Sequence, residues 1–198
     1  MATPKQLYYD KRGSILVQNL QSRHFGAYYC STKEEALEKA LSLIPENATV
    51  GWGGTMTALE VGLLEAIEKG PYQAVGRQMI DPDVFITGAN GLSLDGQMVN
   101  IDGGGNRVGA ILHGPKTVIV IAGMNKVEDT LEAAMNRART IAAPMNQQRF
   151  LRKTPCTVTG VCADCKSEEC ICNQILITRN CRPVGRIQFV LVGEDLGF

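Results

Sequence analysis

The sequence lacks the features that mark several classes of protein. No stretch approaches the roughly 18 consecutive apolar residues of a membrane-spanning helix, and residues 1–9 show no charged region followed by an apolar one, as a secretory signal would. Lysine plus arginine balances aspartate plus glutamate, 20 against 20, so no net charge attracts nucleic acid or an anionic membrane. Internal repeats and low-complexity linkers are also missing. We therefore expect a soluble, cytoplasmic protein that binds neither nucleic acid nor membrane.

Histidine is scarce, and the cysteines are unevenly distributed. The two histidines, His24 and His113, stand alone, and an isolated histidine is more often a surface or core residue than a catalytic one, so neither is assigned a role. The chain has seven cysteines, an odd number, and five of them fall between Cys156 and Cys172. A secreted disulfide framework distributes its bridges differently, which again favours a cytoplasmic protein.

Short apolar stretches alternate with helical patterns along the whole chain. Two helices begin at apparent capping boxes, Thr32 with Glu35 and Thr57 with Glu60. Residues 117–122 form an unbroken apolar run, which is typical of a central parallel strand covered on both faces. The alternation predicts a single-domain α/β fold over residues 1–198, Rossmann-like and layered, with a mostly parallel central sheet and helices on both faces. The predicted helices cover residues 6–20, 32–44, 57–69, 106–113 and 127–143, and the predicted strands cover residues 25–30, 49–50, 84–86, 98–101, 117–122, 175–178 and 187–192. Residues 72–82 are expected to form a connection or a short helix.

Two glycine-rich bends follow predicted strands. Residues 51–57 lie between a strand and a capped helix, where backbone N–H groups and the hydroxyls of Thr55 and Thr57 suit a phosphate or a carboxylate. The bend matches neither a Walker A motif nor a G-x-G-x-x-G fingerprint, and a plain turn between strand and helix stays an equal alternative. Residues 103–105 are three consecutive glycines, which fit a place where the backbone approaches a ligand closely. The helix that follows would direct its N-terminal N–H groups at that bend and favour an anion.

Polar side chains gather near the ends of the same strands. Asp102 or Lys126 would serve as an acid, a base or an anion clamp. Alternatively, Asp102 only caps the helix after the glycines, and Arg107 is only a solvated residue of its first turn. No pair of residues fixes a reaction type, so the catalytic residues stay unassigned. We expect Gly104→Val to block the bend. The expected ligand-binding residues are Gly53, Gly54, Thr55, Gly88, Asn90, Asp102, Gly103, Gly104, Gly105, Asn106 and Lys126.

The cysteine-rich segment, about residues 153–173, carries five thiols at spacings of six, three, five and two. Thiolates clustered in this way surround a soft metal, and the C-x-x-C pair of Cys162 and Cys165 supplies two ligands from one tight loop. Zinc and an iron–sulfur cluster both fit this pattern. A redox disulfide pair and buried free thiols are the alternatives. We predict a metal centre in this segment.

Over nearly its whole length the chain closely resembles the LUD-domain family, the lactate-utilisation type of small protein. The resemblance is carried by residues 50–57, 83–90, 99–103 with 105–108, 153–173 and 192–198. It implies metal ligands at Cys156, Cys162, Cys165 and Cys172, with Cys170 as an extra thiol. It also implies a fold similar to that of NagB-type sugar-phosphate proteins, ribose-phosphate isomerases and CoA transferases.

Within that resemblance, the chain departs from ribose-5-phosphate isomerase at two positions. Asn90 stands where that enzyme has an aspartate, and Asp102 precedes the glycines where it carries a lysine. Isomerisation of sugars is therefore not expected. The resemblance implies binding of a small anionic metabolite and a contribution to lactate or related organic-acid oxidation, with iron–sulfur oxidoreductases as partners. The alternative is a non-enzymatic sensor or binding module for a phosphorylated or CoA-type ligand. Family-type folds also suggest a homodimer, with Trp52 and Met56 beside the first glycine bend.

Overall fold

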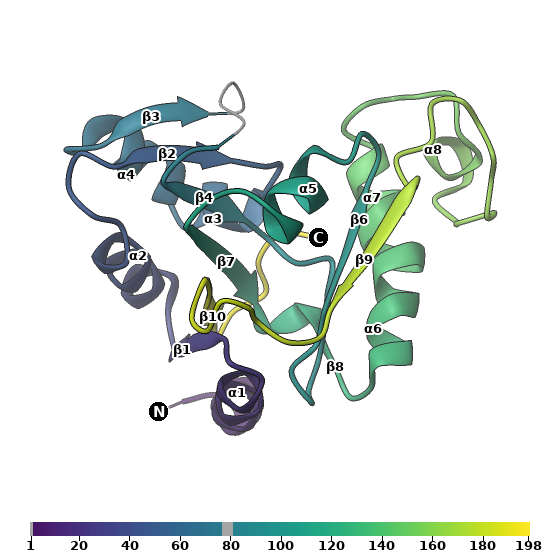
Figure 1. Cartoon of the computed structure of the whole chain (residues 1–198). Coiled ribbons are helices and arrows are strands. Elements are labelled where there is room, and N and C mark those ends of the chain that lie inside the picture. Colours follow the sequence, from purple (N-terminus) through teal and green to yellow (C-terminus); the bar gives the residue numbers. More distant parts are fainter. Residues whose placement is uncertain (1, 77–80) are drawn as a thin grey trace.

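A parallel six-stranded sheet forms the centre of the molecule in a computed structural model, which describes residues 2–76 and 81–198 (Figure 1). All of its strand pairings are parallel, which confirms the predicted α/β fold. Residues 118–123 are all buried, as expected of a central strand. The order of strands is β1 (Gly26–Cys30), β10 (Ile187–Val192), β7 (Thr117–Gly123), β4 (Val84–Thr87), β2 (Thr49–Trp52) and β3 (Gln73–Gly76).

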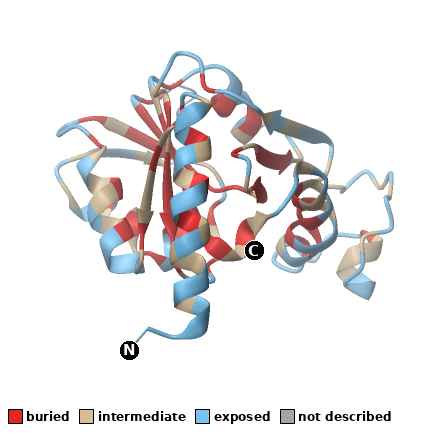
Figure 2. Ribbon diagram, turned by 90° about the horizontal axis from the view of Figure 1, so that it is seen from below, coloured by how far each residue is buried: buried red, intermediate tan, exposed pale blue. Residues whose placement is uncertain are grey.

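Helices cover both faces of this sheet and create two hydrophobic cores. Helices α1 (Pro4–Ser22) and α5 (Asn106–Leu112) contribute to one core, and α2 (Lys33–Ser42), α3 (Met56–Glu60) and α4 (Leu63–Lys69) contribute to the other. Side chains alternate along each strand, so Val118 and Val120 belong to the first core while Ile119 and Ile121 belong to the second. Figure 2 shows the buried residues along these strands and on the helix sides that face them. A continuous apolar run therefore supplies both cores at once.

A second, four-stranded sheet lies beside the central one, and the sequence pattern did not reveal it. Its order is β8 (Val127–Glu128), β5 (Gly91–Ser93), β6 (Met98–Asp102) and β9 (Gln174–Thr178), with antiparallel pairs around β6 and a parallel pair between β5 and β8. Helix α6 (Leu131–Arg137) packs against it through a small core of Val99 and Ile101 with Ala134 and Ala138. The two closing strands, β9 and β10, therefore belong to different sheets.

The helix predicted over residues 127–143 begins later and continues further. Its N-cap is Thr130, whose hydroxyl accepts a hydrogen bond from the N–H of Ala133 at 3.1 Å, and the residues before it form β8. A π-helical turn over Ala138–Ala142 leads directly into α7 (Ala143–Gln147). Pro144 does not end the helix, because it stands in the first turn of α7, where its missing N–H donor is not required.

Two further predictions need correction around the first glycine bend. Thr55, and not Thr57, is the N-cap of α3, since its hydroxyl accepts from the N–H of Ala58 at 3.3 Å. The expected single helix is divided at Gly62, which adopts φ +82°. Within the expected connection over residues 72–82, Gln73–Gly76 form strand β3, and residues 77–80 lie outside the described part of the chain.

The cysteine-rich segment projects from the second sheet and opens with the short helix α8 (Pro155–Thr159) (Figure 1). No residue between positions 155 and 173 is buried. Packing therefore orders this segment only weakly. Among the helices that the structure describes, none is both long enough and apolar enough to cross a bilayer.

Candidate functional site

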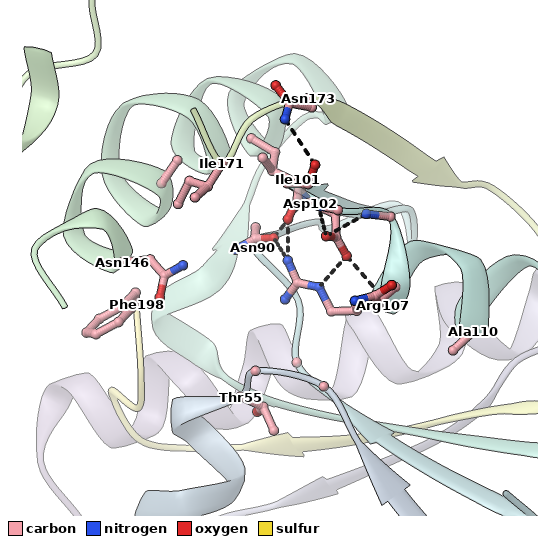
Figure 3. A pocket seen from close by; sticks show the side chains of 18 of the residues that line it. Thr55, Asn90, Ile101, Asp102, Arg107, Ala110, Asn146, Ile171, Asn173 and Phe198 are labelled. Carbon is pink, nitrogen blue, oxygen red and sulfur yellow. Dashed lines mark hydrogen bonds and ion pairs between the residues drawn. The ribbon is translucent and has the colours of Figure 1, made fainter. Parts of the chain in front are cut away.

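A cavity of about 1110 Å³ opens where β2, β4 and β7 end and α5 begins (Figure 3). The segments meet there because the carboxyl ends of parallel strands share one edge of the sheet. Every residue of the expected ligand-binding set lines this cavity: Gly53, Gly54, Thr55, Gly88, Asn90, Asp102, Gly103, Gly104, Gly105, Asn106 and Lys126.

The Asp102 carboxylate holds the second glycine bend together from within. One oxygen accepts from the N–H groups of Gly104 and Gly105, both at 3.1 Å, and the other accepts from those of Arg107 at 3.0 Å and Val108 at 3.2 Å (Figure 3). These are the N–H groups at the start of α5 that we expected to face a bound anion. The chain supplies that anion itself, so Asp102 is a helix cap, as the simpler interpretation held.

The bend has a strict requirement for glycine at Gly105 and not at Gly104. Gly105 adopts φ +85°, a conformation that other L-residues rarely take. A Cβ on Gly104 would meet only the side-chain nitrogen of Asn106, at 3.9 Å, so there is room for a methyl group at this position. That the larger valine of Gly104→Val blocks the bend stays a prediction.

We therefore predict that Gly105→Ala lowers the free energy of unfolding by about 1 to 2 kcal/mol, because it forces a Cβ into the left-handed region. Gly104→Ala is the matched control, since it adds the same methyl group to the same bend without that strain. Urea unfolding of both variants measures the difference. Equal losses in the two variants would contradict the assigned backbone conformation.

Arg107 points back into the cavity wall and is not a solvated first-turn residue. Its Nη2 donates to Asn90 Oδ1 at 2.8 Å and to the carbonyl of Ile101, and its Nε lies 3.9 Å from Asp102 (Figure 3). Its side chain is only 16% exposed. A Cβ on Gly53 would lie 3.4 Å from the Arg107 side chain, so the glycine there makes room for it. A basic residue next to a glycine run was the available signal, but Arg107 was not included in the expected ligand-binding set.

Lys126 is the most unusual group in the cavity. It is 4% exposed, and its Nζ donates to the Thr57 hydroxyl at 2.8 Å. No carboxylate in residues 2–76 or 81–198 forms an ion pair with it. Burial lowers the pKa of Lys126 to about 7, the charges of Arg137 and Arg107 also lower it, and Glu60 opposes them. Thr57, expected to contact a ligand, instead supports Lys126 and donates to the carbonyl of Leu196 at 3.3 Å.

The lining of the cavity is more basic than the chain as a whole. Four lysine and arginine residues line it against two carboxylates, and one of these, Asp102, already accepts hydrogen bonds from backbone N–H groups. Two of the basic residues, Arg149 and Arg152, come from the stretch 147–153, whose basic character the sequence shows without placing it near the bends. Asn146 and Phe198 also reach the cavity from distant parts of the chain (Figure 3). The cavity therefore suits an anion.

A model of the LUD domain matches residues 14–192. The chain belongs to the LUD domain family. This membership makes it a protein related to lactate utilisation, as the resemblance implied. No curated protein matches the chain.

Three solved structures resemble this LUD-domain protein distantly. A DUF162 family protein from Deinococcus radiodurans is 10% identical, with a TM-score of 0.46, over 94% of this chain and 97% of that one. Ribose 5-phosphate isomerase A from Neisseria gonorrhoeae is 23% identical over 50% of this chain and 54% of that one, with a TM-score of 0.36. Ribose 5-phosphate isomerase A from Methanocaldococcus jannaschii is 18% identical over 50% of this chain and 55% of that one, with a TM-score of 0.34. These similarities are too distant to bear on function.

The thiols of the cysteine segment surround a second cavity of about 280 Å³ in this LUD-domain protein. All five cysteines of the segment line it: Cys156, Cys162, Cys165, Cys170 and Cys172. Within the described residues, no three histidine, cysteine, aspartate or glutamate side chains are grouped closely enough to hold a metal ion as they stand. The metal centre therefore stays a prediction.

The two cavities share a wall. Cys170 and Ile171 line both of them. Asn173 anchors this wall to the second glycine bend, because its Nδ2 donates to the carbonyl of Gly103 at 3.0 Å and its N–H donates to the carbonyl of Asp102 at 3.1 Å. A Cβ on Gly103 would lie 3.2 Å from the Cα of Ile171, so that glycine lets the cysteine segment approach.

Proposed function

We propose that this LUD-domain protein binds a small anionic metabolite, a carboxylate or a phosphate, in the large cavity. It would thereby contribute to lactate or related organic-acid oxidation in a cytoplasmic redox system with an iron–sulfur oxidoreductase as partner. The observation that carries the binding proposal is the amine of Lys126, which lines the cavity, is almost fully buried and has no carboxylate paired with it in the described chain.

A buried ammonium without a negative partner is costly, because burial removes its hydration and the Thr57 hydroxyl replaces only part of it. The charges of Arg107 and Arg137 lie close enough to disfavour it further. A bound anion would relieve both effects at once and gain charge-assisted hydrogen bonds from Lys126. The side chain of Asn106 and the backbone of Gly54 border the same space and would orient the anion, whereas the N–H of Gly53 already donates to the carbonyl of Ile86 at 3.0 Å.

The lowered pKa of Lys126 supports an enzymatic role. An amine with a pKa of about 7 exchanges a proton at neutral pH, as a general base or acid must. Asp102, the other candidate, is held as a helix cap and is unsuited to that task. The absence of an acid–base pair among the assigned residues supports the alternative, a sensor or binding module for a phosphorylated or CoA-type ligand.

Titration calorimetry with lactate, pyruvate, inorganic phosphate, a sugar phosphate and coenzyme A tests the proposal. We expect at least one of these anions to bind, and Lys126→Met to weaken its binding by about tenfold to a hundredfold, since a hydrogen bond to a charged group is worth about 1.5 to 3 kcal/mol. Lys116→Met is the matched control, because the Lys116 side chain is 89% exposed and distant from the cavity lining.

An unchanged affinity in Lys126→Met, or no binding by any of the five anions, would contradict the proposal. Lactate-dependent reduction of an electron acceptor, measured with an iron–sulfur oxidoreductase present, distinguishes the two roles. Turnover that needs Lys126 supports the enzymatic role, and tight binding of a phosphorylated ligand or coenzyme A without turnover supports the sensor.

A further inference from the structure

We propose that Cys156, Cys162, Cys165 and Cys172 bind one soft metal centre, zinc or an iron–sulfur cluster, in the smaller cavity, and that this centre fixes the wall shared with the anion cavity. The second part rests on the proposed function, whereas the first part does not. The proposal follows from the donor set, an unpaired buried oxygen and the geometry of the shared wall.

The donor set is concentrated and directed inward. Every cysteine between positions 156 and 172 is partly shielded from solvent, while most of its neighbours in sequence are exposed. All five line the same cavity of about 280 Å³. Four thiolates are the preferred ligand set of a structural zinc ion and of an iron–sulfur cluster.

Gln147 places an unpaired oxygen at the same cavity. Its side chain is fully buried, and its Nε2 donates to the Thr154 hydroxyl at 3.1 Å and to the carbonyl of Glu169 at 3.4 Å. Its Oε1 is buried and has no hydrogen-bond partner in the described structure. A buried acceptor without a donor is costly, and it is stabilised by a cation or by a donor group that moves in when the segment closes. Because a centre held by four thiolates carries net negative charge, the partner expected for this oxygen is a donor group of the closing segment.

The cysteine segment also needs something to order it. None of its residues from 155 to 173 is buried, and α8 buries no side chain at all. The thiols are not grouped to hold an ion as they stand, so binding must bring four sulfur atoms within bonding distance of the centre, about 2.3 Å in the case of zinc. Closure of this kind converts metal-binding free energy into folding free energy of the segment.

Closure would act directly on the anion cavity. Cys170 and Ile171 belong to both cavities, and Cys172 is bound to Cys170 through an N–H to Sγ hydrogen bond of 3.3 Å. Asn173 then joins the segment to the carbonyls of Asp102 and Gly103. A metal on Cys172 would therefore fix the residue directly before Asn173, which is hydrogen-bonded to the glycine bend. Cys170, which lines both cavities, is not a ligand in this assignment.

Anaerobic purification of the full chain, followed by elemental analysis for zinc and iron, tests the first part. We expect a stoichiometric amount of one metal, with a colourless sample for zinc and a brown, oxygen-sensitive one for an iron–sulfur cluster. Cys165→Ser is expected to lose the metal, and the matched variant Cys170→Ser is expected to retain it. Limited proteolysis should cut within residues 153–173 at least tenfold faster after chelation or in Cys165→Ser.

Several results would overturn this part. One is less than about a tenth of an equivalent of zinc plus iron, both as purified and after anaerobic reconstitution, with five titratable thiols in the segment. Another is loss of metal in Cys170→Ser together with retention in Cys172→Ser, which would refute the ligand set. Cleavage at an equal rate with and without metal would refute the ordering of the segment.

The second part is tested by the affinity for whichever anion the calorimetric panel identifies, measured on metal-loaded and chelated protein. We expect chelation to weaken that affinity at least fivefold in the wild type and to leave the already metal-free Cys165→Ser unchanged. Equal affinities in loaded and chelated wild type would refute the coupling and leave the metal site standing. If no anion binds in either state, the proposed function and the coupling both fail, while the metal content still decides the first part.

Discussion

Lys126→Met is expected to stabilise the protein by about 3 kcal/mol at pH 7, although it removes a hydrogen-bonded polar group. Burial holds the pKa of Lys126 at about 7 in the folded chain, against 10.5 for an exposed lysine. A shift of this size costs the folded state about 4 kcal/mol at pH 7, and loss of the hydrogen bond to Thr57 returns about 1 kcal/mol of that. Thr57 keeps its hydrogen bond to the carbonyl of Leu196, so methionine leaves no polar group unpaired.

The sign of the pH dependence follows from the lowered pKa of Lys126. Between pH 7 and 10.5 the unfolded chain binds a proton at this site that the folded chain does not, so the stability of the wild type rises with pH across this window. The stability that the folded chain loses by burying Lys126 is largest below pH 7, and none is lost above pH 10.5. The advantage of Lys126→Met should therefore be largest at pH 6 to 7 and should disappear near pH 10.

Urea unfolding of the wild type, Lys126→Met and Lys116→Met at pH 7 and pH 10 measures this effect. Because Lys116 is exposed, the stability of Lys116→Met should change between pH 7 and pH 10 by the same amount as that of the wild type. If Lys126→Met is less stable than the wild type at both pH values, Lys126 is not the isolated, strained amine that the structure shows. A group that costs stability in this way is retained for function, which agrees with its place in the anion cavity.

The sequence predicted the parts of the fold that depend on local pattern. The unbroken apolar run over residues 117–122 could only be a strand covered on both faces, and Thr32 with Glu35 correctly marked the start of α2. The sequence also predicted which residues line the cavity, because parallel strands determine where these residues lie. Once the strands are parallel, the segments that follow β2, β4 and β7 must meet at one edge of the sheet.

The parts that failed depend on contacts between distant segments. Gln174–Thr178 pairs with β6 in the second sheet instead of with its neighbour β10, and no local pattern specifies that choice. Thr57 with Glu60 has the spacing of a capping box, yet burial against Lys126 and Leu196 places Thr57 inside the helix. A solvated Arg107 stayed an alternative in the sequence because its partners, Asn90 and the carbonyl of Ile101, become neighbours only when the glycine bend folds.

Asp102→Ala is expected to lower the free energy of unfolding by about 3 kcal/mol, because it removes a largely buried carboxylate and leaves the groups bonded to it without a partner. The substitution leaves the N–H groups of Gly104, Gly105 and Val108 without their acceptor, and Arg107 loses the carboxylate beside it. Asp102→Asn is the matched control, since it keeps the shape and one acceptor oxygen while removing the charge. It should lose about half as much stability, as measured by urea unfolding.

The same variant offers a test of which anion the bend recognises. In the wild type the Asp102 carboxylate fills the N-terminal site of α5, so added acetate or formate should not stabilise it there. In Asp102→Ala the vacated N–H groups form an anion site with Arg107 beside it. Acetate or formate at high concentration should therefore restore part of the lost stability in Asp102→Ala, with a smaller effect in Asp102→Asn and none in the wild type. Equal stabilisation of all three proteins would show that the added anion acts elsewhere, and that the carboxylate of Asp102 is not what holds the bend.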